Sequence, residues 1–283
     1  MPCIKNIIIA GAHTLPITLD VFFNYDQSQK PILIYAHGFN GFKDWGNFDL
    51  IAERFVAAGY TLVKFNFSHN GTTPDHPDSF TNLDAFGNNN YTKQLADLKL
   101  MVDWVCDPLN IYQPVINSNQ LYLLGHSMGG GIAILEAASD NRVKKLITWA
   151  AIGECKTPWA NWPLNKIQAW KDTGVAYYHN SRTNQQLPLY FQLYEDYLQN
   201  QERLDIEKAM AKLKIPVLIC HGSADQAVPV SIAWRLKKLN PLAQLFITDS
   251  DHVFGRKHPC TSHALPAAME AVVNASIKFL NIN

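Results

Sequence analysis

Residues 121–135, Leu-Tyr-Leu-Leu-Gly-His-Ser-Met-Gly-Gly-Gly-Ile-Ala-Ile-Leu, decide the fold of this chain. The apolar run before Gly125 is typical of a buried strand, and the apolar segment after Ser127 is compatible with a helix. Ser127 therefore falls on a sharp strand-to-helix turn, the setting called a nucleophile elbow. A side chain at Gly125 or Gly129 would collide with the neighbouring strand or helix. Such a turn holds the Ser127 hydroxyl out over the sheet and points the N–H of Met128 toward the same space.

Composition limits the classes of protein to which the chain can belong. Its 283 residues are 47% hydrophobic and 17% charged, which excludes a disordered chain and allows a large core. Lys plus Arg and Asp plus Glu both total 24, so the charge favours neither nucleic acid nor an anionic membrane. We therefore expect a small-molecule partner, no nucleic acid and no membrane. The sequence does not fix the oligomeric state, and a homodimer is left open.

Cysteine use and apolar runs indicate a compartment. The five cysteines are scattered, odd in number and never spaced C-x-x-C, so neither a disulfide framework nor a zinc site is indicated. The apolar patch at residues 7–12 is shorter than a signal-peptide core, and no run reaches the roughly 20 residues of a membrane span. We expect a soluble, unprocessed, cytoplasmic protein.

Strand and helix patterns alternate on both sides of residues 121–135. Residues 5–23 predict an antiparallel edge hairpin, and a helix pattern at 95–105 ends at Asp107-Pro108. Further strands are predicted at 31–36, 61–67, 145–151, 215–222 and 243–248, and further helices at 48–56, at 230–238 and at the end of the chain. The fold class is α/β, a mostly parallel sheet with helices on both faces.

The alternation fails between residues 153 and 214, which are dense in aromatic residues and contain three prolines. We interpret residues 1–152 and 215–283 as the core and residues 153–214 as an insertion. Its aromatic residues could line an apolar pocket over Ser127 or form a small core of their own. Lys and Arg are not concentrated there, so the sequence does not favour an anionic substrate.

A serine hydroxyl needs a base within hydrogen-bonding reach and an acid that orients the base. Loops at the carboxyl ends of parallel strands supply such partners. Asp225 follows one predicted strand and His252 follows the last one. Asp225 could instead be a turn residue or a helix cap. Asp249 and Asp251 are alternative acids, although their position beside His252 suits a loop cap better.

Ten histidines compete for the role of base. His252 is preferred, and His258 and His263 in the same late region are its competitors. His126 leaves the turn in another direction, and packing or a turn bond suffices to explain His221. The remaining histidines considered are expected at the surface, namely His13, His69, His76 and His179.

An acyl-transfer intermediate also needs two backbone donors aimed at its oxyanion. The N–H of Met128 is one, and the loop after an early strand can present the N–H of Phe39 as the other. Gly38 lets that loop come close. The alternative is an ordinary turn at the end of a strand.

Four segments together carry a family resemblance: Ala36–Gly41 (AHGFNG), Gly125–Gly130 (GHSMGG), His221–Asp225 (HGSAD) and Asp251–Phe254 (DHVF). Over nearly its whole length the chain resembles the α/β-hydrolase superfamily, and within it the dienelactone-hydrolase-like and cinnamoyl or feruloyl esterase branch. The resemblance implies a triad of Ser127, Asp225 and His252, oxyanion donors at Phe39 and Met128, and an inserted lid at 153–214. This chain carries Ser127 where dienelactone hydrolases carry a cysteine.

These observations predict a serine hydrolase that cleaves carboxylic esters of small, aromatic or medium-chain acids through an acyl-enzyme. No metal or organic cofactor is required. The same residues could serve a peptidase, an amidase or a thioesterase. A non-catalytic module that binds a small ligand is the alternative from another class.

Overall fold

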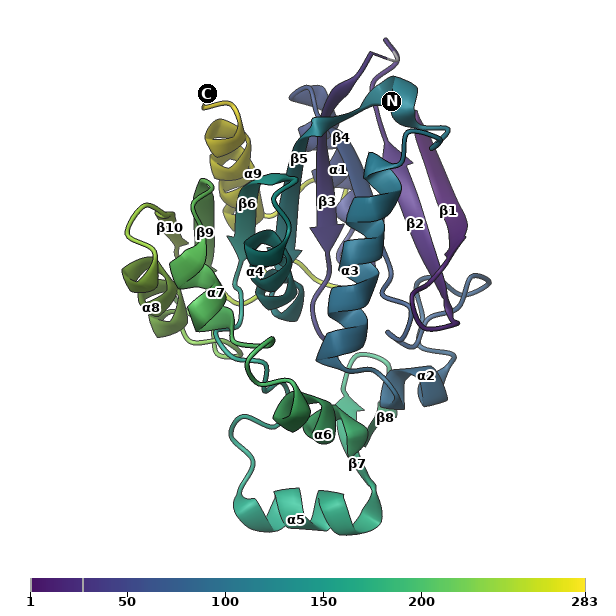
Figure 1. Ribbon diagram of the computed structural model, residues 1–283, viewed down its shortest axis with the longest axis vertical. Coiled ribbons are helices and arrows are strands. Elements are labelled where there is room, and N and C mark those ends of the chain that lie inside the picture. The colour runs from purple at the N-terminus through teal and green to yellow at the C-terminus, as the bar shows by residue number, and fades with distance from the viewer. Residues whose placement is uncertain (1, 27, 283) are drawn as a thin grey trace.

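A computed structural model of the protein describes residues 2–26 and 28–282. Within these residues, eight strands form one sheet in the order β1-β2-β4-β3-β5-β6-β9-β10 (Figure 1). Its strands are β1 (Cys3–Ala10), β2 (Pro16–Phe22), β3 (Lys30–Ala36), β4 (Thr61–Phe65), β5 (Ile116–His126), β6 (Val143–Trp149), β9 (Val217–Gly222) and β10 (Gln244–Thr248). Strand β2 pairs antiparallel with β1 and with β4, and the other neighbours are parallel. The predicted α/β class, the mostly parallel sheet and the N-terminal edge hairpin are therefore confirmed.

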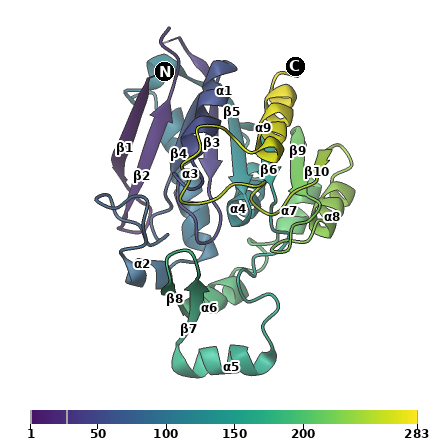
Figure 2. The same ribbon diagram turned by 180° about the vertical axis from the view of Figure 1, so that it is seen from behind.

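Helices cover both faces of the sheet (Figures 1 and 2). On one face lie α3 (Tyr91–Cys106), α4 (Met128–Ser139), α7 (Ile206–Lys212) and α8 (Ser231–Leu239), and on the other lie α1 (Phe48–Ala57) and α9 (Ala267–Leu280). Apolar residues at helical spacing explain this arrangement, because they form one stripe that the sheet removes from water. In α1 that stripe is buried and consists of Phe48, Ile51, Ala52, Phe55 and Val56.

The polar segment between β4 and α3 is more regular than its composition indicates. It contains the short helix α2 (Leu83–Gly87), which the sequence pattern did not predict. The side chain of Asn82 caps α2 by accepting a hydrogen bond from the N–H of Ala85 at 3.0 Å. Helix α3 follows and ends at Cys106, just before Asp107-Pro108, as the proline predicts. The 3-10 turn η1 (Gln113–Val115) leads into β5.

Between β6 and β9 the chain forms α5 (Leu164–Thr173), the hairpin of β7 (Val175–Asn180) and β8 (Gln185–Tyr190), and α6 (Gln192–Gln199), before α7 returns to the sheet. Figure 1 shows the hairpin beside α2 and below the sheet, with α5 farthest from it. Trp170 is buried, and its ring contacts those of Trp159 and Tyr194. These rings form a small core within the inserted residues.

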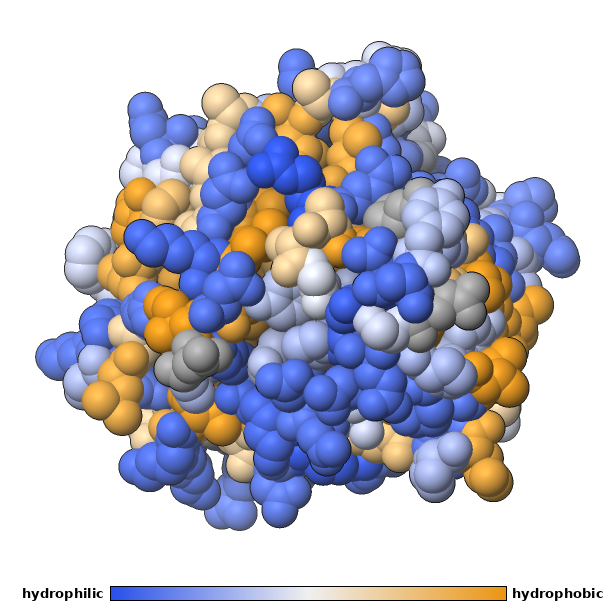
Figure 3. Space-filling model, turned by 90° about the horizontal axis from the view of Figure 1, so that it is seen from above, coloured by the Kyte–Doolittle hydropathy of each residue, from blue (hydrophilic) through white to orange (hydrophobic). Residues whose placement is uncertain are grey.

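One face of the molecule shows how polar and apolar residues are distributed on its surface. The face in Figure 3 is covered largely by hydrophilic residues with apolar ones between them. Across the described ranges, no helix combines the length and the apolar character needed to cross a bilayer. All five cysteines are free thiols.

Candidate active site

Ser127 stands between the end of β5 and the start of α4 with φ 55° and ψ −118°, a conformation that L-residues rarely adopt. Its N–H donates to the carbonyl of Trp149 at 2.8 Å, which helps to hold the turn. A Cβ on Gly125 would lie 2.3 Å from the carbonyl oxygen of Gly129, and one on Gly129 would lie 2.3 Å from that of Ala36. Both glycines are therefore required by close backbone approach, as the sequence indicates.

His252, in the loop after β10, reaches Ser127. Its Nε2 lies 3.0 Å from Ser127 Oγ, and its Nδ1 lies 2.7 Å from Asp225 Oδ2. Because a carboxylate can only accept, Nδ1 carries the hydrogen and Nε2 is free to accept the serine proton. The three residues chosen from the sequence therefore form one chain of hydrogen bonds.

Asp225 follows β9 and is held from two sides. Its Oδ1 accepts hydrogen bonds from the N–H groups of Ala227 at 2.9 Å and Val228 at 2.8 Å. Burial alone would raise the pKa of Asp225, but hydrogen bonds from His221 and His252 lower it well below its usual value. The side chain therefore remains a carboxylate that can orient and charge-stabilise an imidazole.

His221 contacts the acid Asp225, a role that the sequence pattern did not predict. Its Nε2 lies 2.8 Å from the carbonyl oxygen of Val228 and 3.2 Å from Asp225 Oδ2. Both partners accept, so Nε2 carries the hydrogen and donates to the acid. The two residues are four positions apart in the sequence. This spacing predicts a hydrogen bond between their side chains only if the chain makes a tight turn directly after the strand.

The other histidines do not contact Ser127 Oγ. His126 does leave the turn in another direction, and its Nε2 lies 3.0 Å from the carbonyl oxygen of His252, so it ties the loop of the base to the elbow. The Nδ1 of His258 accepts from the N–H of Gly46, and His263 is exposed. The surface expectation is wrong for His69, which is 7% exposed because its ring packs beside Ser68 and bonds to the Ser68 hydroxyl.

The loop after β3 lies directly against the elbow. A Cβ on Gly38 would be 2.9 Å from Ser127 Cβ, so glycine allows this approach. Among the described residues, no acceptor is bonded to the N–H of Phe39. The N–H of Met128, the first residue of α4, has no intrahelical acceptor. Phe39 and Ser127 line the same cavity, Met128 directly follows Ser127, and the use of these two N–H groups as oxyanion donors remains a prediction.

Ser127 and His252 open into a cavity of about 440 Å³, a volume typical of small-molecule sites. Phe39, Trp45 and Tyr178 contribute aromatic walls. Among the aromatic residues of the insertion, Tyr178 lines this pocket, whereas Trp159, Trp170 and Tyr194 belong to the small core.

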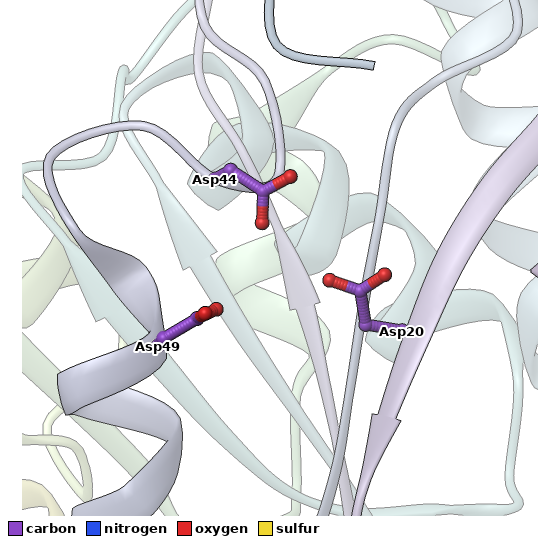
Figure 4. Close-up of side chains that lie close together, drawn as sticks. All are labelled: Asp20, Asp44 and Asp49. Atoms are coloured by element: carbon purple, nitrogen blue, oxygen red, sulfur yellow. The ribbon is translucent and has the colours of Figure 1, made fainter. Parts of the chain in front are cut away.

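Asp20, Asp44 and Asp49 make the one acidic cluster in the described ranges that has metal-ligand geometry (Figure 4). Lysines of the protein itself pair with these carboxylates. Lys43 Nζ lies 2.8 Å from Asp20 Oδ2, and Lys64 Nζ contacts all three carboxylates. Burial alone would lower the pKa of Lys64, but these carboxylates raise it, so the amine stays protonated. We therefore infer that this cluster has a structural role and stabilises the neighbouring loop.

Comparison with known proteins identifies the family of this fold. The family described as alpha/beta hydrolase fold matches residues 31–173, about half of the chain. The quorum-quenching protein AidA of Acinetobacter baumannii is 28% identical over 146 residues, which are 52% of this chain and 43% of AidA. The chain thus matches less than half the length of that curated relative.

Solved structures share the fold over nearly the whole chain. Est1E from Butyrivibrio proteoclasticus, solved with ferulic acid bound, has a TM-score of 0.68 at 19% identity and covers 98% of this chain and 100% of its own. The monoacylglycerol lipase of Paleococcus ferrophilus has a TM-score of 0.64 at 16% identity, with 93% of this chain and 98% of the lipase covered. At these identities the likeness concerns the fold.

Proposed function

The chain belongs to the alpha/beta hydrolase fold family, and from that premise we propose that it is a serine esterase acting on carboxylic esters of small, aromatic or medium-chain acids. The observation that carries the proposal is the position of His252, with one ring nitrogen on Ser127 Oγ and the other on Asp225. This arrangement turns a weak nucleophile into a reactive one.

Each reaction step uses a group at the site. Ser127 Oγ attacks the ester carbonyl while His252 Nε2 takes its proton, and the Asp225 carboxylate stabilises the imidazolium. The N–H groups of Phe39 and Met128 donate to the oxyanion of the tetrahedral intermediate. His252 then gives its proton to the leaving alcohol. Water then attacks the acyl-enzyme while His252 takes its proton. The tetrahedral intermediate breaks down to release the acid, and His252 returns the proton to Ser127 Oγ.

We also propose that residues 153–214 act as a lid that shapes the acyl pocket. Tyr178 in β7 lines the cavity, and Phe39 packs edge-to-face on its ring with centroids 5.1 Å apart. An aromatic acyl group suits such a wall, since rings prefer offset or edge contacts with one another. The ferulic acid bound to Est1E, an aromatic acid held by a protein of the same fold, is consistent with this choice.

The test is the variant Ser127→Ala, assayed with matched ester, amide and thioester derivatives of one acid. We expect ester turnover to fall by a factor on the order of 10⁴ with the fold intact, and labelling by a fluorophosphonate to be lost. Ser223→Ala, an exposed serine after β9, is the control and should change neither. Full activity in Ser127→Ala would refute the proposal. Faster turnover of the amide or the thioester would reassign the reaction to those bonds.

A further inference from the structure

Arg182 brings a positive charge to the pocket, although the sequence does not favour an anionic substrate. It lies in the turn of the β7–β8 hairpin and lines the same cavity as Ser127. Its Nη2 donates to the carbonyl oxygen of Asn40 at 2.9 Å, so the guanidinium reaches from the insertion to the loop that carries Phe39. Folding thus places the charge at the pocket wall, which the sequence order of the insertion does not show.

This charge has no acidic side chain beside it in the cavity wall. The cavity wall contains no aspartate, glutamate or lysine, and Arg182 is its one arginine. No carboxylate of the described residues forms an ion pair with Arg182, whereas Arg54 pairs with one carboxylate and Arg142 and Arg235 pair with two each. The bond to Asn40 uses one of the five N–H donors of a guanidinium, so most of them are available to a ligand.

A second arginine, Arg256, lies behind the same wall. Arg182 and Arg256 have their guanidinium carbons 5.3 Å and 5.2 Å from the ring centre of Trp45. Arg256 is 4% exposed, and its Nη1 and Nη2 have no hydrogen-bond partner of good geometry among the described residues, while Tyr35 and Asp251 lie close enough to stabilise its charge. The Nε1 of Trp45, also buried, has none either. This corner is therefore richer in donors and positive charge than in acceptors, and an anion would add an acceptor there.

We propose that Arg182 binds a carboxylate carried by the ester, so that the preferred substrates are esters bearing one free carboxylate, such as monoesters of dicarboxylic acids. The guanidinium fork matches a carboxylate in two parallel hydrogen bonds. A single arginine at the wall suits a single negative charge better than a phosphate dianion. This inference rests on the proposed esterase function and names its substrate class.

The test compares monomethyl adipate with methyl hexanoate, which differ in a terminal carboxylate against a terminal methyl. We expect the wild type to prefer monomethyl adipate, and Arg182→Gln to lose about tenfold or more in kcat/KM for it, mainly through KM. For methyl hexanoate the change should stay within about twofold. Arg182→Lys should keep part of the preference, and added salt should weaken it. Arg203→Gln, an exposed arginine of the same insertion, is the control and should change neither ester.

A binding measurement separates this inference from the proposed reaction. Free adipate should raise the melting temperature of Ser127→Ala, and this shift should be lost in Ser127→Ala/Arg182→Gln. If no ester is cleaved but adipate still binds through Arg182, the reaction is refuted and the anion site stands. If esters are cleaved with no preference for monomethyl adipate and adipate gives no shift, the anion site is refuted and the reaction stands. Equal losses on both esters in Arg182→Gln would also overturn the inference, because they indicate a structural role.

Discussion

Replacing Asp20 by asparagine should destabilise the protein strongly, because it removes a carboxylate shared by two buried ammonium groups. The side chains of Asp20 and Lys64 are 0% exposed and that of Lys43 is 1% exposed, with Nζ to Oδ2 distances of 3.3 Å for Lys64 and 2.8 Å for Lys43. Asp20 Oδ1 also accepts from the N–H of Asn6 at 2.8 Å. An asparagine amide cannot accept on both sides, so one group of donors would face its NH₂.

The size of the loss in the free energy of unfolding depends on the carboxylates that remain beside the two lysines. Breaking a buried ion pair by removing one partner costs about 3–5 kcal/mol. Asp44 and Asp49 still face the ammonium groups in Asp20→Asn, and they are 27% and 31% exposed. We therefore expect a loss near the lower end, about 3 kcal/mol, because these two carboxylates compensate part of the excess charge.

Urea unfolding measures this loss as a lower midpoint at an unchanged slope. The matched control is Asp26→Asn, since Asp26 pairs with Lys30 at 2.9 Å but is 51% exposed. That variant should lose much less than Asp20→Asn, because an exposed ion pair contributes little to stability. Equal, small losses in the two variants would refute the reasoning, because the buried network would then contribute no more than a surface pair.

Two further outcomes are expected. Burial lowers the pKa of His37 and of His69 from 6.5 to about 4 and that of His126 well below 6.5. The unfolded state therefore binds more protons between these pKa values, and stability decreases as the pH is lowered through them. The loss of stability at pH 5 should be roughly 2 kcal/mol for each of His37 and His69. Burial raises the pKa of Glu136 to about 7, which opposes this loss, so urea unfolding of Glu136→Gln should show a steeper decrease of stability on acidification. An unchanged stability at pH 5 in both the wild type and Glu136→Gln would contradict this explanation. Gly38→Ala should lower kcat about 100-fold, because a Cβ 2.9 Å from Ser127 Cβ pushes the N–H of Phe39 away from the oxyanion. Unchanged kinetics in a folded variant would remove Phe39 from that role.

The sequence alone predicts the sheet and three of the site residues for a common physical reason. Apolar runs bounded by turn residues mark strands, and parallel strands end at one edge, so side chains just after them converge. Ser127, Asp225 and His252 each follow such a run. Helix α2 was missed because five residues give little periodicity, and its signal is the cap at Asn82. The role of His221 and the position of Arg182 depend on how a turn closes and where a hairpin lies, which periodicity does not encode.

Two groups of charge in this protein lead to opposite conclusions from one principle. Around Asp20, each ammonium group faces carboxylates of the chain itself, so folding meets the desolvation cost internally and the cluster is structural. Around Trp45, two guanidinium groups lie near one ring with no carboxylate paired to either among the described residues. Arg256 is buried, whereas Arg182 is exposed and lines the cavity that contains Ser127. Water solvates Arg182 in the free protein, and we propose that a carboxylate of the substrate replaces that water.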